Sequence, residues 1–186
     1  MKFISDVLKC DSDYKSLLND CEKNHLPTLC TGLSNVHKAA IVSALHGHLN
    51  KKIAVITPDE ATADALLSDL VSLKVNAVNF PSRDYCLCNM QGYSKEYEQK
   101  RTDTLSKLLG GGFGVLTLSL DAALQYTLPP QKLEAANFML KSGDCIEIGA
   151  LCEKLLNSGY VRSELCEGIG QFSLRGGIFD IFPVNQ

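Results

Sequence analysis

The sequence predicts an α/β domain, in which a parallel sheet carries helices on both faces, followed by part of a small α+β domain. Apolar segments of strand length alternate with segments of helical periodicity as far as residue 128. One of these strands, KKIAVIT, is apolar on both faces, as expected in a parallel sheet that is covered on both sides. After Pro129-Pro130 the pattern changes to strand alternation interrupted by glycines. We therefore expect two domains, at residues 1–134 and 135–186.

The first part of the chain predicts a helix, a short strand and a second helix. Apolar residues at helical spacing indicate an amphipathic helix over about 12–23. Pro27 then introduces the apolar segment TLCT at 28–31, which we interpret as a strand. Gly32 opens a turn, and the apolar residues of the next helix are Val36, Ala40, Ile41, Ala44 and Leu45.

The strand KKIAVIT leads directly into a helix with a clear start. Thr57 can cap this helix, Pro58 suits its first turn, and Glu60 can complete a capping box. A third strand, VNAVNF, follows the helix and stops at Pro81. The next segments are a loop over 81–94, a helix ended by three glycines, and the apolar strand FGVLTLSL. This alternation implies right-handed crossovers and a parallel sheet.

The second domain predicts a different order of elements. FMLKSG is interpreted as a strand, 148–158 as a short helix closed by Gly159, and 160–182 as β structure. The domain has only about 50 residues, which is few for an independent core. It also ends directly after the apolar strand GIFDIFPV. We therefore expect the natural chain to continue past Gln186.

Composition excludes several classes of function. The chain has 45% hydrophobic and 21% charged residues, the ordinary mixture of a soluble globular protein. No apolar run has the length needed to cross a bilayer, and there is no signal peptide, so we expect a cytoplasmic protein without a membrane partner. The eight cysteines contain no C-x-x-C pair, which disfavours zinc. The net charge of −3 and the absence of a basic stripe disfavour nucleic-acid binding by this piece alone.

The turn before the second helix can be aligned with the phosphate loop G-x-x-x-x-G-K-[ST]. Gly32 matches the first glycine and Lys38 the lysine, but His37 replaces the second glycine and Ala39 the hydroxyl residue. A Cβ at His37 obstructs the path of a loop that wraps phosphate, and Ala39 has no oxygen for Mg²⁺. We interpret the segment as a degenerate phosphate loop, related by ancestry to a nucleotide site but without a working one.

The C-terminal run GQFSLRGGIFDIFP, at 170–183, resembles the G-x-[FY]-x-x-R-G-[GA]-[IL]-x-D-[IVL]-[FY]-P run of transcription-repair coupling factors. It is more loosely similar to the corresponding run of the excision-repair helicase UvrB. Gly159-Tyr160-Val161-Arg162 resembles the G-Y-x-R that precedes this run in the family. The loop from Phe80 to Tyr85 and the helix after it also resemble the family's first domain.

The resemblance implies a UvrB-like module. Residues 1–134 would be a degenerate RecA-like domain similar to UvrB domain 1a, and 135–186 the start of a UvrA-docking domain similar to UvrB domain 2. In the family this module has no ATPase of its own and needs no cofactor. ATP and Mg²⁺ belong to the downstream motor of the parent chain, an ATP-dependent DNA translocase. RNA polymerase and duplex DNA would be bound by downstream domains that the 186 residues do not include.

The candidate UvrA-binding residues are Arg175, Arg162 and Phe172, although the apolar residues of this stretch, Phe172 included, also suit a core. Asp180 is expected to pair with Arg175 or to bond backbone amides. The leading hypothesis is a non-catalytic module that recruits UvrA and thereby links stalled RNA polymerase to nucleotide excision repair. The alternatives are a functional nucleotide-binding helicase-type domain of a UvrB-like DNA repair enzyme, and a scaffold domain unrelated to repair.

Overall fold

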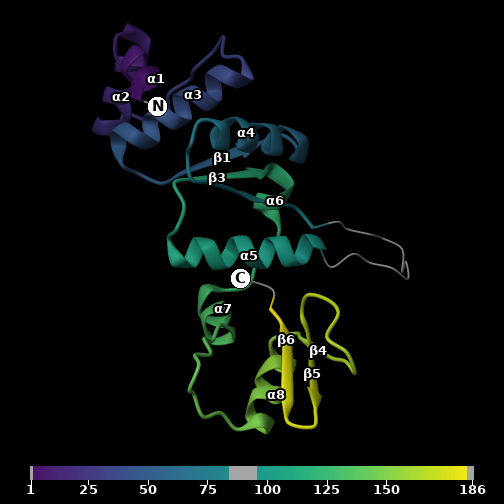
Figure 1. The fold of residues 1–186 in the computed structure, drawn as a ribbon. Helices are drawn as coiled ribbons and strands as arrows, with labels where there is room; N and C mark the ends of the chain where they lie inside the picture. The colour runs from purple at the N-terminus through teal and green to yellow at the C-terminus, as the bar shows by residue number, and fades with distance from the viewer. Residues whose placement is uncertain (1, 84–95, 184–186) are drawn as a thin grey trace. The chain divides into compact units, whose positions relative to one another are not determined.

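The computed structural model describes residues 2–83 and 96–183, with side chains from Ile4 to Arg83 and from Glu98 to Pro183. Most of the loop predicted over 81–94, with Cys86 and Cys88, therefore lies outside the described residues. The chain divides into two compact units, Met1–Gln125 and Tyr126–Gln186 (Figure 1). No helix among the described residues has the length and apolar character needed to cross a membrane.

The first unit is built on a three-stranded parallel sheet. Its strands are β1 (Ile53–Thr57), β2 (Ala77–Phe80) and β3 (Val115–Ser119), in the order β1-β3-β2. Val115 of the central strand stands in register with Ile53 on one side and Ala77 on the other. The predicted α/β class with a parallel sheet is confirmed.

Helices cover both faces of this sheet, as predicted. On one face, α3 (Asn35–Leu49) and α4 (Glu60–Ser72) bury Ala39 and Leu70 against Val115 (Figure 1). On the other face, Leu105 of α5 (Glu96–Gly110) and Ala122 of α6 (Leu120–Leu124) pack with Phe80 and Leu118. Successive residues of β3 thus enter opposite cores, which explains why the strand is apolar on both faces. Full burial of a side chain such as Leu70 contributes about 1.5–3 kcal/mol.

A buried arginine fixes α5 on the sheet. Arg101 lies with its guanidinium carbon 4.0 Å from the centre of the Phe80 ring, and its Nη1 donates to the carbonyl of Pro81 at 2.5 Å. One turn further along, the Thr104 hydroxyl donates to the carbonyl of Asn79 at 2.8 Å. These contacts hold α5 against β2 and against Pro81, the residue that follows this strand.

The start of α4 differs from the prediction. Asp59 is the N-cap, and its Oδ1 accepts a hydrogen bond from the backbone N–H of Thr62 at 2.7 Å. Thr57, the predicted cap, is buried at the end of β1 and donates to the carbonyls of Asp59, at 2.8 Å, and Leu118, at 3.3 Å. The pairing of β1 with β3 therefore decides the role of Thr57. Glu60 does not complete a capping box either, because its carboxylate bonds residues at the ends of two other strands.

The N-terminal region consists of helices without the predicted strand. Helices α1 (Lys2–Leu8) and α2 (Ser12–Lys23) precede an irregular segment, which contains a cis peptide bond between Leu26 and Pro27. The strand predicted at 28–31 is wrong: these residues have no regular structure, and Leu29 is 87% exposed. A four-residue apolar run has no strand character of its own unless another strand pairs with it.

The second unit combines two helices and a small mixed sheet, which confirms the α+β prediction. Its helices are α7 (Pro130–Ala136) and α8 (Ile148–Asn157). Its strands are β4 (Val161–Arg162), β5 (Gln171–Arg175) and β6 (Ile178–Phe182), with β4 parallel and β6 antiparallel to β5. The strand predicted for FMLKSG is wrong, because 138–143 are irregular apart from a turn.

One apolar core and one tight turn organise this unit. The fully buried Phe172 packs against Leu151 and Leu155 of α8, and its ring stacks on that of Phe179 with centroids 5.6 Å apart. Gly176 and Gly177, between β5 and β6, have φ angles of +52° and +94°. Two consecutive residues with positive φ are what a two-residue hairpin turn requires, which explains the glycine pair.

Candidate partner-docking surface

The degenerate phosphate loop lies before and within the first turn of α3. Gly32 has a φ of +76°, a conformation that suits glycine, and Ser34 caps the helix by accepting from the His37 N–H at 3.5 Å. His37 and Lys38 are exposed, whereas Ala39 is fully buried in the core beside Val115. The position that holds a magnesium-binding hydroxyl in a working loop is therefore a packing position in this fold.

The surroundings of this loop do not favour a polyphosphate. A cavity of about 570 Å³ lies beside the start of α3, and His37 lines it together with apolar residues. The charged side chains of its lining are the carboxylates of Asp11, Asp13 and Asp20. Carboxylates repel phosphate groups, particularly in a partly enclosed site. The described residues also contain no group of three or more His, Cys, Asp or Glu side chains that could hold a metal ion.

The acid at the carboxyl end of the sheet is used for structure. Glu60 Oε1 accepts from the backbone N–H of Ser82 at 2.8 Å and from the Ser119 hydroxyl at 2.5 Å. The fully buried Ser119 oxygen in turn accepts from the Ala122 N–H at 3.1 Å. Glu60, which follows β1, thus links Ser82, which follows β2, to Ser119, the last residue of β3. Sequence reasoning missed this role because it depends on strands that are far apart in the chain.

The hairpin of the second unit has one core-facing side and one outward side. Cross-strand neighbours share a side, and successive residues alternate between sides. Phe172 stands opposite Ile181, and both belong to the core. Arg175 stands opposite Ile178, and Ser173 stands opposite Asp180, so these side chains lie on the other side. Phe172 points into the core and side chains alternate along β5, so Arg175, three residues later, points outward.

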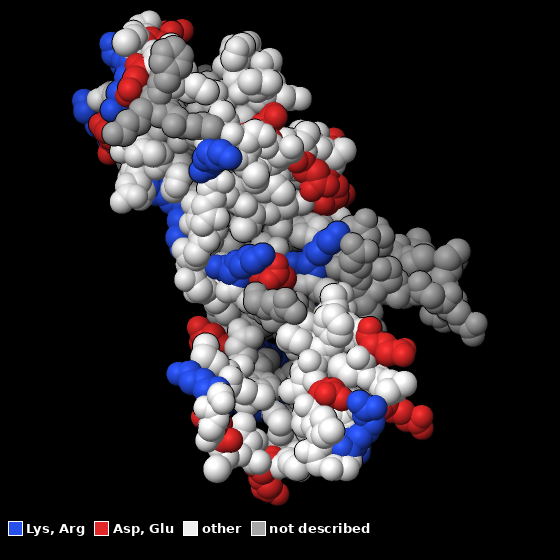
Figure 2. Space-filling model, in the orientation of Figure 1, with Lys and Arg blue, Asp and Glu red and all other residues white. Residues whose placement is uncertain are grey.

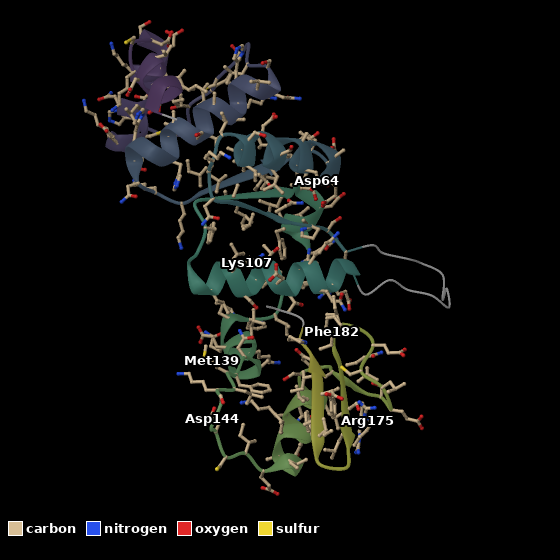
Figure 3. The ribbon with its side chains drawn as sticks, viewed as in Figure 1. Asp64, Lys107, Met139, Asp144, Arg175 and Phe182 are labelled. Atoms are coloured by element: carbon tan, nitrogen blue, oxygen red, sulfur yellow. The ribbon has the colours of Figure 1, made fainter. Side chains whose placement is uncertain are left out.

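Arg175 and Asp180 form an ion pair across this hairpin. Arg175 Nη2 donates to Asp180 Oδ2 at 2.8 Å, and the two side chains are 54% and 39% exposed. Of the two roles expected for Asp180, the structure shows the pairing with Arg175. Arg175 lies at the turn end of β5, and Phe182 lies at the opposite end of β6 (Figure 3).

Exposed apolar residues lie beside this ion pair. Ile178, directly opposite Arg175, is 63% exposed, and Phe182 is 37% exposed. We define the outer hairpin face by those residues on this side that the loop over 163–170 leaves accessible, including one from the neighbouring strand β4. Its members are Val161, Arg175, Ile178, Asp180 and Phe182.

The three predicted partner-binding residues do not lie together. Arg162 stands in register with Phe172, on the core-facing side of the sheet, whereas Val161 stands in register with Gln171 on the outer side. Phe172 itself has no exposed surface and is a core residue. Of the three, only Arg175 belongs to the outer hairpin face. Sequence reasoning assigned Ile178 and Phe182 to the core, although they alternate along β6 with Phe179 and Ile181, which do belong to it.

A loop over 163–170 covers the middle of the outer side. The Gln171 carboxamide oxygen accepts from the N–H groups of Glu167 and Gly168, both at 3.0 Å. The buried Ser173 hydroxyl donates to the Glu164 carbonyl at 3.1 Å. On the side of the molecule that Figure 2 displays, basic and acidic residues are interspersed without an extended basic area. The outer hairpin face is thus a local patch of one ion pair and exposed apolar residues.

Comparison with known proteins shows what the chain and its second unit are similar to. Residues 138–186 match the UvrB interaction domain family. Over its whole length the chain is 29% identical to the transcription-repair-coupling factor of Bacillus subtilis (strain 168). It is 28% identical, over 99% of its length, to the factor of the same name from Staphylococcus aureus (strain USA300). In both cases it spans 16% of the length of the relative. The resemblance predicted from the sequence is therefore confirmed: the chain is similar over its whole length to transcription-repair-coupling factors, and its residues 138–186 match the UvrB interaction domain.

Proposed function

We propose that the chain is the UvrA-recruiting module of a transcription-repair-coupling factor and that it docks UvrA through the outer hairpin face. The proposal rests on one observation. The segment that matches the UvrB interaction domain also contains an exposed face with an ion-paired arginine between exposed apolar residues. By this function the module would link stalled RNA polymerase to nucleotide excision repair.

The composition of the face supports a protein interface. Interface centres are enriched in aromatic residues and arginine, and a few such residues commonly contribute most of the binding energy. Ile178, Asp180 and Phe182 alternate along β6, so their side chains project on one side over roughly 13 Å at 3.3 Å per residue. A row of this length is compatible with the central part of a docking site of ordinary size.

A direct test compares two exposed arginines of the same sheet. Arg175→Glu and Arg162→Glu make the same change of charge, but Arg162 lies on the core-facing side of the register. We expect Arg175→Glu to weaken binding of the chain to purified UvrA at least tenfold and Arg162→Glu to leave it within about twofold. Circular dichroism and melting temperature monitor the fold of both variants. Equal binding by the parent and Arg175→Glu would contradict the proposal.

We further propose that the module is non-catalytic and binds no ATP. The proposal is supported by the buried Ala39, by the Cβ of His37 where the phosphate loop needs glycine, and by the structural use of Glu60. Mg-ATP at about 100 times its dissociation constant would raise stability by about 2.7 kcal/mol. We expect no rise in melting temperature with Mg-ATP relative to Mg²⁺ alone. A clear rise would favour the alternative, a nucleotide-binding helicase-type domain of a UvrB-like enzyme.

The remaining activities are proposals for the whole protein of which this chain resembles a part. ATP hydrolysis with Mg²⁺, translocation on duplex DNA and contact with RNA polymerase would reside outside the 186 residues. We also expect the chain itself to bind duplex DNA weakly, because its net charge is −3.

A further inference from the structure

We infer that Asp180 is a positioning residue that presents Arg175 to a carboxylate of UvrA, on a partner surface that also offers an apolar recess for Ile178 and Phe182. The inference rests on the proposed function, because it specifies how the outer hairpin face would be recognised. It assigns a role to Asp180, a charged residue in the middle of an otherwise apolar strand.

The ion pair between Arg175 and Asp180 contributes little to the stability of the fold. Both side chains are substantially exposed, at 54% and 39%, and exposed ion pairs contribute little to stability because water and salt screen them. The hairpin already has its glycine turn and its core contacts through Phe172 and Phe179. The stability of the fold therefore does not explain the aspartate at position 180. Its orientation of Arg175 does explain it.

Asp180 orients the side chain of Arg175. A free arginine side chain has many rotamers, and ordering it at an interface lowers affinity. Asp180 stands two residues along β6 from Ile178, the direct neighbour of Arg175, so the pair is diagonal across the hairpin. The 2.8 Å bond directs the guanidinium along the outer face before any partner arrives. Preorganisation of this kind increases affinity without adding a contact.

The guanidinium of Arg175 suits a partner that offers a carboxylate. A guanidinium carries five N–H donors in a planar fork, and among the described residues the recorded bond of Arg175 uses one nitrogen, Nη2. Donors therefore remain for a second carboxylate, the anion that matches this fork best. Ile178 and Phe182 lie two residues to either side of Asp180 on the same side of β6. Apolar groups at these places would exclude water from the pair once a partner with a matching recess is bound.

The experiment measures the affinity of the full chain for purified UvrA with Asp180→Ala and Asp180→Asn. We expect Asp180→Ala to weaken binding about two- to fivefold with an unchanged melting temperature, as suits an exposed ion pair. Asp180→Asn keeps a side-chain oxygen that can accept from Arg175, so it should rescue part of the loss. Glu153→Ala removes an exposed acid from α8 and serves as the matched control, with binding unchanged.

A charge-swapped double variant, Arg175→Asp with Asp180→Arg, separates positioning from structure. The swap restores an ion pair within the hairpin but places the arginine on the other strand. We expect a melting temperature near that of the parent and no recovery of UvrA binding. If the double variant binds UvrA as the parent does, the fixed position of Arg175 is irrelevant and the inference is wrong.

Each outcome separates the inference from the proposed function. If Arg175→Glu abolishes binding while both Asp180 variants bind as the parent does, docking stands and the positioning role fails. If Arg175→Glu also binds as the parent does, the proposed function fails. If Asp180→Ala unfolds, the test uses Asp180→Asn, whose side chain has the same size as that of the parent. Binding of UvrA by Asp180→Asn with the same affinity and the same salt dependence as the parent would overturn the inference. The acidic partner is tested by salt: affinity of the parent should fall between 50 and 500 mM NaCl more steeply than that of Arg175→Ala, and equal slopes would overturn it.

Discussion

The Tyr14 hydroxyl lies 2.7 Å from Nδ1 of His48, and the two rings meet edge to face with centroids 5.7 Å apart. The other ring nitrogen of His48, Nε2, lies 2.6 Å from the Ser5 hydroxyl. These residues belong to α2, α3 and α1, and Tyr14 is only 4% exposed. One imidazole therefore joins both N-terminal helices to the helix that covers the sheet.

Removing this imidazole should loosen the N-terminal helices. His48→Ala leaves the buried Tyr14 hydroxyl without its partner, and an unsatisfied polar group of this kind costs roughly 1–3 kcal/mol. Urea unfolding of the variant should show a loss of this size. His25→Ala, which removes a largely exposed histidine, is the control and should cost less than 0.5 kcal/mol, approximately the range of ordinary surface substitutions. Equal stability of the two variants would contradict the role of His48.

The same contact should make stability depend on pH. Burial lowers the pKa of His48 below its ordinary value of 6.5, Lys9 lowers it further, and Asp6 opposes these effects. A lowered pKa in the folded state means that the contribution of neutral His48 is present above about pH 6.5 and is lost as pH falls through the folded pKa. Unfolding measured from pH 7.5 to pH 5 should show this decline. The decline attributable to His48 should be absent in His48→Gln, and an identical profile in the two proteins would refute the assignment.

Tyr14 should titrate later than an ordinary tyrosine. Burial, with a smaller effect of Cys21, raises the pKa of Tyr14 to about 12 from its ordinary value of 10.0. Because the folded pKa is raised, the associated stability is present below about pH 10 and falls as pH rises towards about 12. Absorbance of tyrosinate should show a late-titrating group that disappears in Tyr14→Phe. If Tyr14→Phe removes a group that titrates near pH 10, the hydroxyl is not buried.

Gly114 should tolerate no side chain while His46 is in place. A Cβ at Gly114 would overlap Nε2 of His46, and the other ring nitrogen of His46 lies 2.8 Å from the Lys51 carbonyl oxygen. Gly114→Ala should therefore cost about 1–3 kcal/mol by overpacking, whereas Gly112→Ala, where the space is open, should cost less. Combining Gly114→Ala with His46→Ala should recover part of the loss, as a coupled pair requires. Strict additivity of the two losses would show that the residues do not interfere.

Glu60 should be more important for stability than its position at a helix start indicates. Glu60→Ala leaves the Ser82 N–H and the buried Ser119 hydroxyl without their shared acceptor, which should cost roughly 1–3 kcal/mol. Glu60→Gln retains an acceptor oxygen and should cost less. Asp121→Ala, an exposed acid after β3, is the control for loss of charge. If Glu60→Ala and Asp121→Ala unfold at the same urea concentration, the bonds to the strand ends contribute nothing.

The fold was predictable from the sequence where local pattern and tertiary packing agree. The central strand β3 is apolar on both faces because α3 and α4 cover one side of the sheet and α5 and α6 the other. In the edge strand β1, Ile53 and Val55 join the first of these cores, whereas Ile56 on the other face is 59% exposed. The segments 28–31 and 138–143 have the same local character but no partner strand among the described residues, so the predicted strands do not form. Helix α1 was not predicted, and the capping role of Asp59 was assigned to Thr57, which strand pairing instead buries.

The candidate site was predictable only in part, for a similar reason. Alternation along one strand is enough to separate Arg175 from Phe172, and the ion pair with Asp180 follows from their spacing across a two-residue turn. The side on which Arg162 lies depends on the register of β4 against β5, which is a pairing between separate strands. No pattern within the four residues 159–162 determines that register. Of the three residues predicted to bind the partner, the structure places only Arg175 on the outer hairpin face.

The central claim, that UvrA docks on the outer hairpin face, is tested most directly by amide hydrogen exchange of the chain with and without saturating UvrA. Burial of that face should slow exchange in peptides that cover Val161 and 171–182, while exchange in α3 and α4 of the first unit stays unchanged. Arg175→Glu should abolish the slowing at the same UvrA concentration. Slowing confined to the first unit, or binding of UvrA with unchanged exchange over 171–182, would contradict the account.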